Sequence, residues 1–157
     1  MLVYLDTNVY CRPFDDQSQE RIRREATAFV ELIELVQERK LDFLNSEILE
    51  FEIGRIKDRE RLARVQSYLN LCSVKLKGSE EQLELAKELE RGCNLKGRDA
   101  LHIAAACLGR AAYCVTCDDL VLKRADCCAK VTEEHGFRAI LIGPEELKDV
   151  LKGGNPL

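Results

Sequence analysis

The sequence predicts a three-layer α/β/α fold in which a central parallel sheet of four or five strands lies between helices. Short apolar runs alternate with longer segments of helical period, which is the pattern of strands joined by crossover helices. The runs are apolar throughout, as expected for strands covered on both faces. The 157 residues show no repeat, linker or low-complexity tract, and 46% are hydrophobic. We therefore expect a single domain over residues 1–157.

The first half of the chain is expected to form three strands and three helices. The strands are apolar runs at residues 2–5, 41–44 and 73–76. The helices have apolar residues spaced by three and four positions. The first carries Ile22, Ala26, Phe29, Ile33 and Val36 and ends near Lys40; the second begins at Asn45 or Ser46 and runs to about Lys57; the third carries Leu62, Val65 and Leu69.

The second half adds two strands and further helices. Residues 79–82 form a capping box, and the helix that it opens carries Leu83, Ala86 and Leu89 and ends at Gly92. Residues 98–109 are apolar almost all round, so that helix should be buried. Strands are expected at 112–116 and 138–142. A helix should follow the first from Asp118 or Asp119, and Pro144 should open a terminal helix.

Bulk properties exclude several classes of protein. No apolar run approaches the roughly 18 residues that a membrane span needs. The N-terminus lacks a basic region followed by an apolar stretch, so we expect a cytoplasmic protein without a secretory signal. The net charge of −4 gives no general attraction to nucleic acid, which argues against an architectural binder. A nuclease remains compatible because metal ions can neutralise its acids.

The eight cysteines are interpreted as free thiols. Several lie inside apolar segments, and free cysteine usually behaves as a small buried hydrophobe in a reducing compartment. Cys114 and Cys117 form a CxxC pair, and Cys127 and Cys128 follow ten residues later. A zinc site there is the less favoured alternative, because a strand and its following turn would have to bend into a knuckle.

Three aspartates stand where ligands gather in a parallel sheet, near the carboxyl ends of strands. Asp6 closes the first strand, Asp118 follows the strand that ends at Thr116, and Asp99 stands at the start of a buried helix. Each also has a purely structural interpretation. Asp6 and Asp118 are common residue types in turns and caps, and Asp99 would suit a helix N-terminus.

Glu52 decides between these interpretations. With an advance of about 100° per residue, and Ile48 placed at 0°, Ile56 falls at about 80° and Ile53 at about 140°. Glu52 falls at about 40°, within the apolar stripe, whereas Glu50 falls near 200°. A buried carboxylate needs a partner. Either a salt bridge to Arg55 or Arg59 supplies it, or the four acids surround Mg²⁺ or Mn²⁺, which favour carboxylate and water oxygens.

Four short motifs resemble the ordered signature of PIN-domain nucleases. They are Leu5-Asp6-Thr7-Asn8, Ser46 with Glu52 six residues on, Arg98-Asp99-Ala100 and Thr116-Cys117-Asp118. The resemblance implies cleavage of single-stranded RNA with Mg²⁺ or Mn²⁺. It places Asp6, Glu52, Asp99 and Asp118 at the family's acidic metal ligands and catalytic positions. Thr7, Asn8 and Thr116 fall at its accessory polar positions, and Asp119 is an alternative to its neighbour.

One histidine and several basic residues also lie near these motifs. His102, one turn after Asp99, is interpreted as a packed helix histidine in preference to a ligand of metal or substrate. Arg98 is the favoured phosphate contact, with Arg12 and Lys123 on adjoining segments. The basic cluster over residues 55–64 is interpreted as a solvated helix face rather than a steering surface.

The sequence leaves three functions open. The leading one is a metal-dependent ribonuclease, the toxin of a toxin–antitoxin pair, as the resemblance implies for many small stand-alone members; its partners would be RNA, an antitoxin and a second copy in a homodimer. The second is a nuclease-inactive PIN-like scaffold, which should have lost an acid. The third is a phosphohydrolase with Asp6 as nucleophile, disfavoured because Asn8 occupies the second acidic place and Lys123 fits the lysine position poorly.

Overall fold

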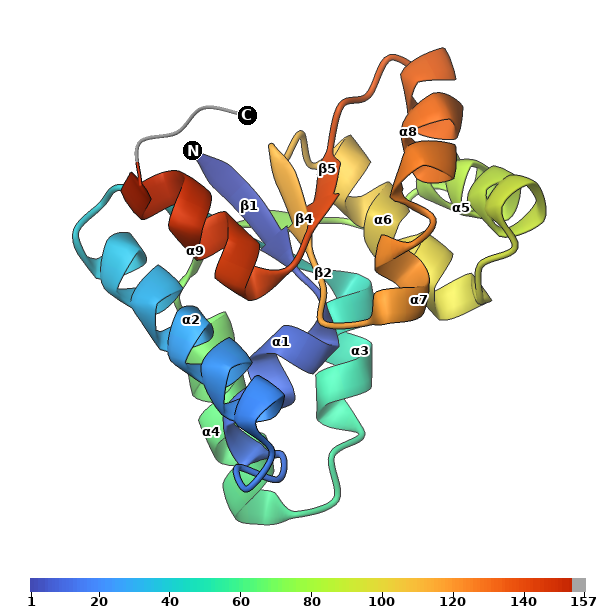
Figure 1. Ribbon diagram of the computed structural model, residues 1–157. Helices are drawn as coiled ribbons and strands as arrows, with labels where there is room; N and C mark the ends of the chain where they lie inside the picture. The colour runs from blue at the N-terminus through green and yellow to red at the C-terminus, as the bar shows by residue number, and fades with distance from the viewer. Residues whose placement is uncertain (154–157) are drawn as a thin grey trace.

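The computed structural model describes residues 1–153, which form a five-stranded parallel sheet with helices on both faces (Figure 1). The strands are β1 (Leu2–Leu5), β2 (Asp42–Ser46), β3 (Cys72–Leu76), β4 (Tyr113–Val115) and β5 (Ile140–Ile142). Their order is β3-β2-β1-β4-β5, so β1 lies at the centre. Its Tyr4 pairs in register with Leu44 of β2 and with Cys114 of β4. The predicted fold class is confirmed.

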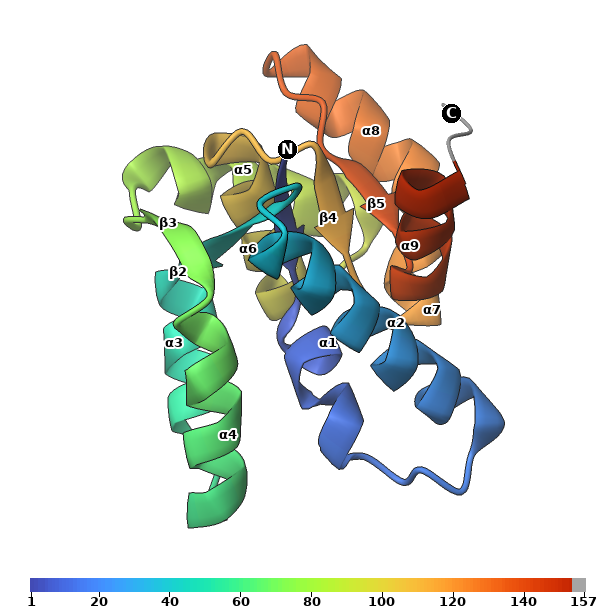
Figure 2. The same cartoon turned by 90° about the vertical axis from the view of Figure 1, so that its left-hand side faces the viewer.

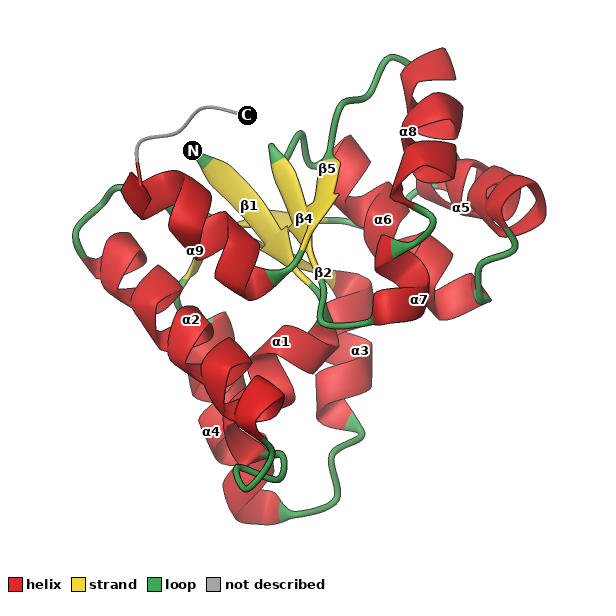
Figure 3. Ribbon diagram, in the orientation of Figure 1, coloured by secondary structure: helices red, strands yellow, loops and turns green. Residues whose placement is uncertain are grey.

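Two layers of helices enclose this sheet (Figure 2, Figure 3). The helices are α1 (Thr7–Cys11), α2 (Glu20–Gln37), α3 (Glu47–Gly54), α4 (Arg59–Leu69), α5 (Glu80–Cys93), α6 (Gly97–Leu108), α7 (Asp119–Leu122), α8 (Ala125–Glu134) and α9 (Pro144–Gly153), with a 3-10 turn at Arg12–Phe14. One layer holds α2, α4 and α9, and the other holds α5, α6 and α8. No helix within residues 1–153 combines the length and apolar character that a membrane crossing requires.

Aromatic side chains fill the core between β1, β2 and the α2 layer. Tyr10, Phe29 and Phe43 are fully buried. The Phe29 ring meets that of Tyr10 edge to face at 5.6 Å between centroids, and that of Tyr68 at 5.1 Å. Such edge-to-face pairs stabilise by about 0.5–1.5 kcal/mol beyond their burial. These contacts hold α2 and α4 against the sheet and fix the segment that follows β1.

The observed elements differ from the predicted ones mainly at their ends. Helix α3 ends at Gly54 rather than near Lys57, and the last strand begins at Ile140 rather than at 138. Helix α1 was not predicted, because its five residues are too few to show a period. The helix expected after Asp118 is two helices, with Arg124 outside the regular helix between them.

One cysteine pair contradicts the expectation of free thiols. Cys93, at the end of α5, forms a disulfide with Cys127 near the start of α8. The two helices pack on each other and bring the Cα atoms to 5.7 Å, within the range that a disulfide spans. A pairing across 34 residues leaves no local pattern in the sequence. The zinc alternative fails as well, since Cys127 is bonded and the described chain has no cysteine-based metal cluster.

Candidate metal centre

Asp6 lies at the carboxyl end of the central strand, in a cradle of polar side chains. Thr116, which follows β4, donates from its hydroxyl to Asp6 Oδ2 at 2.9 Å, and Asn8 donates from Nδ2 to the same oxygen at 3.1 Å. Asn8 also bonds to the Thr116 hydroxyl and accepts from the Cys117 amide at 3.0 Å. Asp6 as a whole residue is only 8% exposed. These bonds occupy Oδ2 and leave Oδ1 facing His102 Nε2 at 3.4 Å.

Glu52 approaches Asp6 from α3, as its inward position on the helix requires. The Thr7 hydroxyl donates to Glu52 Oε1 at 2.6 Å, and His102 Nε2 lies 2.5 Å from the same oxygen. Arg98 Nε lies 3.4 Å from Oε2. Burial raises the pKa of Glu52, but His102, Thr7 and Arg98 outweigh it and the net pKa is lowered. The carboxylate is therefore charged, and its basic partners are not the predicted Arg55 or Arg59.

His102 lies on α6 between the acids and the sheet, and it is buried. Its Nε2 lies 3.4 Å from Asp6 Oδ1 in addition to its contact with Glu52. On the opposite side of the ring, Nδ1 lies 2.5 Å from the hydroxyl of Tyr4. Burial opposes protonation of the ring, but Asp6, Glu52 and Asp99 together raise its pKa above the ordinary value. The sequence predicted a packed histidine, and His102 is buried as expected, but its Nε2 also contacts Asp6 and Glu52.

Asp99 and Asp118 line a hollow of about 320 Å³ beside this cluster. Burial raises the pKa of Asp99, and the charges of Asp6 and Asp118 raise it further. Asp99 and Asp118 therefore face the same hollow. Asp118 caps the N-terminus of α7 and accepts the Leu120 amide with Oδ1 at 2.9 Å, so its other oxygen is the one available to a ligand.

The donor set fits a divalent cation. Ligand atoms of Asp6, Glu52 and His102 lie within 4.8 Å of one another, the one such group in the described chain. The pKa of Asp99 is raised first by burial and then by repulsion from the charges of Asp6 and Asp118. A cation relieves this repulsion. The structure thus brings Asp6 and Glu52 together with one imidazole, and it places Asp99 and Asp118 on a shared hollow rather than in that group.

The remaining predicted residues are placed differently. Asp119 turns away and binds Arg21 of α2 with both carboxylate oxygens, at 2.6 and 2.8 Å. Arg12 is held by Glu25 at 2.9 Å and by Asp15 at 3.1 Å. Lys123 is exposed at the end of α7. Asp118, and not Asp119, therefore shares a hollow with Asp99. Of the three predicted phosphate contacts, Arg98 is the one that lies against Glu52.

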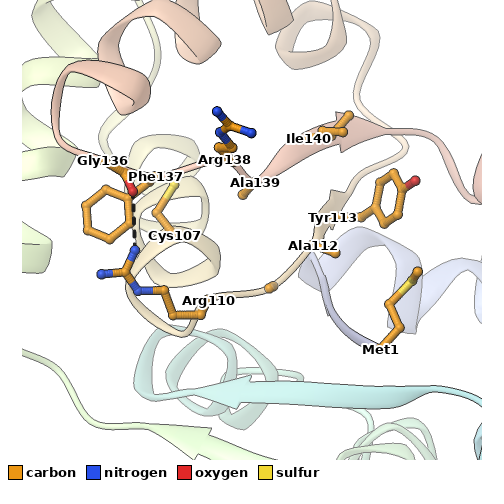
Figure 4. Close-up of a pocket in the computed structure, with 11 residues that line it drawn as sticks. Met1, Cys107, Arg110, Ala112, Tyr113, Gly136, Phe137, Arg138, Ala139 and Ile140 are labelled. Atoms are coloured by element: carbon orange, nitrogen blue, oxygen red, sulfur yellow. Dashed lines mark hydrogen bonds between the residues drawn. The ribbon is translucent and has the colours of Figure 1, made fainter. Parts of the chain in front are cut away.

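Other hollows in the described chain lack this chemistry. One of about 540 Å³ lies where β1, β4 and β5 begin, at the opposite edge of the sheet from Asp6 (Figure 4). Arg110 stacks there over the Phe137 ring at 4.7 Å and donates to the Gly136 carbonyl at 3.3 Å (Figure 4). No carboxylate lines it. The basic cluster on α4 lines a separate hollow with Asp58 and Glu60, away from the four acids.

His102 and Tyr4 are the site residues that the sequence argument missed. His102 lies three positions after Asp99 on one helix, so both point to the same side. That spacing was visible in the sequence. Tyr4 was hidden in the apolar run of β1, where nothing distinguishes a hydroxyl that bonds to a site residue from one that only packs.

Comparisons with known proteins agree with the fold described above. Residues 3–126 match the family profile described as PIN domain. No individual curated protein sequence gives a significant match. Among solved structures, the fold is similar to that of VapBC2 from Rickettsia felis bound to a DNA fragment from its promoter, with a TM-score of 0.58, 18% sequence identity, and coverage of 91% of this chain and 98% of that one. Because the family profile spans most of the sequence, the chain belongs to the PIN-domain family.

Proposed function

We propose that the protein is a single-domain, metal-dependent endoribonuclease that cleaves single-stranded RNA. The observation that carries the proposal is the close approach of Asp6, Glu52 and His102 from three separate segments, together with a hollow that Asp99 and Asp118 line. Membership of the PIN-domain family, whose members are generally nucleases, supports it. So does the sequence itself, which has an acid in each of the four motifs that resemble the family's signature, whereas an inactive scaffold should have lost one.

Asp6 and Glu52 would hold the ion, with Asp99 and Asp118 completing the site from the neighbouring hollow. When bound, Mg²⁺ or Mn²⁺ supplies charge neutralisation and a water of lowered pKa for attack on phosphorus. Asn8 and Thr116 fix Asp6 by bonding to Oδ2, and Thr7 fixes Glu52 by bonding to Oε1. These bonds keep the carboxylates oriented before substrate arrives, which is how preorganised sites lower barriers.

Arg98 is the proposed phosphate contact. Its side chain is 71% exposed although Nε reaches Glu52, so the guanidinium lies at the rim of the acidic cluster. An arginine there can bind a phosphate with two parallel bonds. Lys123 is exposed near Asp118 and serves as a second contact, whereas Arg12 is occupied by its buried ion pair with Glu25.

The biological role that we propose is that of a toxin whose partner is an antitoxin protein and which forms a homodimer. The support is the resemblance to small stand-alone PIN-domain proteins and the similar fold of VapBC2, which was crystallised on a fragment of its promoter. An antitoxin would act most directly by covering the edge of the sheet at which the acids converge.

The test is cleavage of a labelled single-stranded RNA by purified protein with Mg²⁺, Mn²⁺ or EDTA. Asp6→Asn and Glu52→Gln each remove one charge at nearly constant shape, and Glu84→Gln makes the same change at an exposed position on α5. We expect cleavage that EDTA abolishes, that both site variants lose by at least about a hundredfold, and that Glu84→Gln retains.

Two outcomes would overturn the proposal. If folded protein cleaves no RNA and binds no divalent cation, the site is not a nuclease centre. If cleavage persists in EDTA and in both site variants, the four acids do not perform it.

A further inference from the structure

We infer that His102 is a ligand of the metal and that its imidazole gives the site a preference for Mn²⁺ over Mg²⁺. The inference rests on the proposed function and extends it, because that proposal names only the four acids as ligands and leaves the choice of cation open. It follows from where each ring nitrogen points and from what holds the ring.

The Nε2 atom points into the acidic cluster. It lies 2.5 Å from Glu52 Oε1, 3.4 Å from Asp6 Oδ1 and 3.5 Å from the Thr7 hydroxyl. The side chain is 3% exposed, so solvent does not compete for this nitrogen. A cation bound by Asp6 and Glu52 therefore lies within reach of the imidazole, which must either coordinate it or leave the space that it occupies.

The Nδ1 atom is held from behind by a chain of buried hydroxyls. It lies 2.5 Å from the Tyr4 hydroxyl, which lies 2.9 Å from Ser46 Oγ. Ser46 Oγ also accepts the Leu49 amide at the start of α3. In the neutral ring with Nδ1–H donating to Tyr4 and Tyr4 donating to Ser46, Nε2 carries the lone pair with which the imidazole can bind a cation.

This arrangement is the usual support of a ligating histidine, whose second nitrogen donates to a fixed partner. The partner here lies on the central strand, and the ring itself lies on the buried helix α6. Tyr4 is fully buried, so the support cannot swing away.

The chemistry of the donors sets the preference between the cations. Mg²⁺ binds oxygen ligands in a strict octahedron and keeps several waters. Mn²⁺ also favours carboxylate and water oxygens, but as a transition-metal ion it accepts a nitrogen ligand more readily than Mg²⁺ does. One nitrogen among the carboxylates therefore improves the binding of Mn²⁺ without a comparable gain for Mg²⁺.

The first experiment is electron spin-echo spectroscopy of Mn²⁺ bound to the wild-type protein without RNA. We expect modulation from one imidazole nitrogen. The chain has two histidines, and the other, His135, is exposed and contacts Glu88 of α5. The modulation should therefore persist in His135→Gln and vanish in His102→Gln.

The second experiment is calorimetric titration with each metal alone. We expect His102→Gln to weaken Mn²⁺ binding by about tenfold or more and Mg²⁺ binding by less than about threefold. Tyr4→Phe should weaken Mn²⁺ binding by about tenfold as well, since it keeps the ligand and removes its support.

The outcomes separate this inference from the proposed function. Wild-type protein that binds Mn²⁺ at the four acids without nitrogen modulation overturns the role of His102 and leaves the nuclease proposal intact. Equal loss of Mn²⁺ and Mg²⁺ affinity in His102→Gln overturns the preference. Failure of the wild-type protein to bind either metal contradicts both proposals. If His102→Gln does not fold, the wild-type spectrum alone decides.

Discussion

Placing Asp99 near the other acids destabilises the ionised form of its carboxyl group. Its carboxyl is partly buried, and the charges of Asp6 and Asp118 act on it from two sides, so its pKa is raised. The folded protein then holds the Asp99 proton to a higher pH than the unfolded chain does. As pH rises from the ordinary carboxyl pKa through the raised value, Asp99 therefore lowers the free energy of unfolding.

Asp99→Asn should accordingly stabilise the metal-free protein at neutral pH. The gain should be no more than about 1 kcal/mol, because the site is half exposed and solvent screens it. It should disappear below the ordinary carboxyl pKa, where Asp99 is protonated in both states. Urea unfolding in EDTA at pH 7 and near pH 3 measures both quantities. A destabilised variant at pH 7 would contradict this assignment.

The sequence allowed some site residues to be predicted and not others, for physical reasons. Glu52 was predictable because helical geometry fixes which side chains face inward. Asp118 could not be separated from Asp119, because the choice depends on Arg21, a residue 98 positions away that binds Asp119 and not Asp118. For His102 the helical period predicts the face of the helix but not the contact with the Tyr4 hydroxyl that holds the ring.

At the scale of elements, the end of α6 packs unusually closely on the sheet. Gly109 follows the helix, and a Cβ at this position would overlap the buried Leu44 side chain of β2 and lie 3.2 Å from the Ala105 carbonyl. Only glycine allows the helix this approach. The same helix carries Asp99 and His102 at its other end, so this contact helps to fix the site.

Gly109→Ala should therefore lower the free energy of unfolding by about 1–3 kcal/mol, the usual cost of overpacking a core. Gly54→Ala is the matched control, because a Cβ at Gly54, in the last turn of α3, meets no atom within 4 Å. The control should be neutral or slightly stabilising. Urea midpoints of the two variants make the comparison, and equal midpoints would show that Leu44 moves aside without cost.

Long periodic elements were predictable, whereas short ones and their ends were not. The pattern around Phe29 identified α2, and the capping box at Ser79 identified α5, where the Ser79 hydroxyl accepts the Gln82 amide. The five residues of α1 follow directly from β1, and tertiary contacts of Tyr10 with Phe29 and Phe43 hold them in place. Local sequence contains no record of such contacts.

At the scale of the whole molecule, the disulfide joins the two segments that flank the hollow containing Asp99 and Asp118. Asn94 lies next to Cys93 and lines that hollow, and Arg124 lines it from the side of Cys127. The bond therefore limits how far the two walls can separate. It also closes a covalent loop across 34 residues, which restricts the unfolded chain.

Removing this bond should lower the free energy of unfolding by about 3–4 kcal/mol, from the loop-closure entropy of its length. Cys93→Ser combined with Cys127→Ser tests this in guanidinium unfolding with and without dithiothreitol. The wild type should lose stability on reduction, and the double variant should be insensitive to it. Wild-type stability unchanged by dithiothreitol would contradict the expectation.

The central position of β1 has a consequence for how the protein fluctuates. The Asp6 amide donates to the Val115 carbonyl at 2.8 Å, so the backbone of this acid belongs to the hydrogen-bonded interior of the sheet. Amides there exchange with solvent deuterium only when the whole domain opens, whereas the outer strands β3 and β5 exchange through smaller openings. Asp6 is thus anchored in the last part of the chain to open, and the edges of the sheet can open locally without displacing Asp6 from Glu52 and His102.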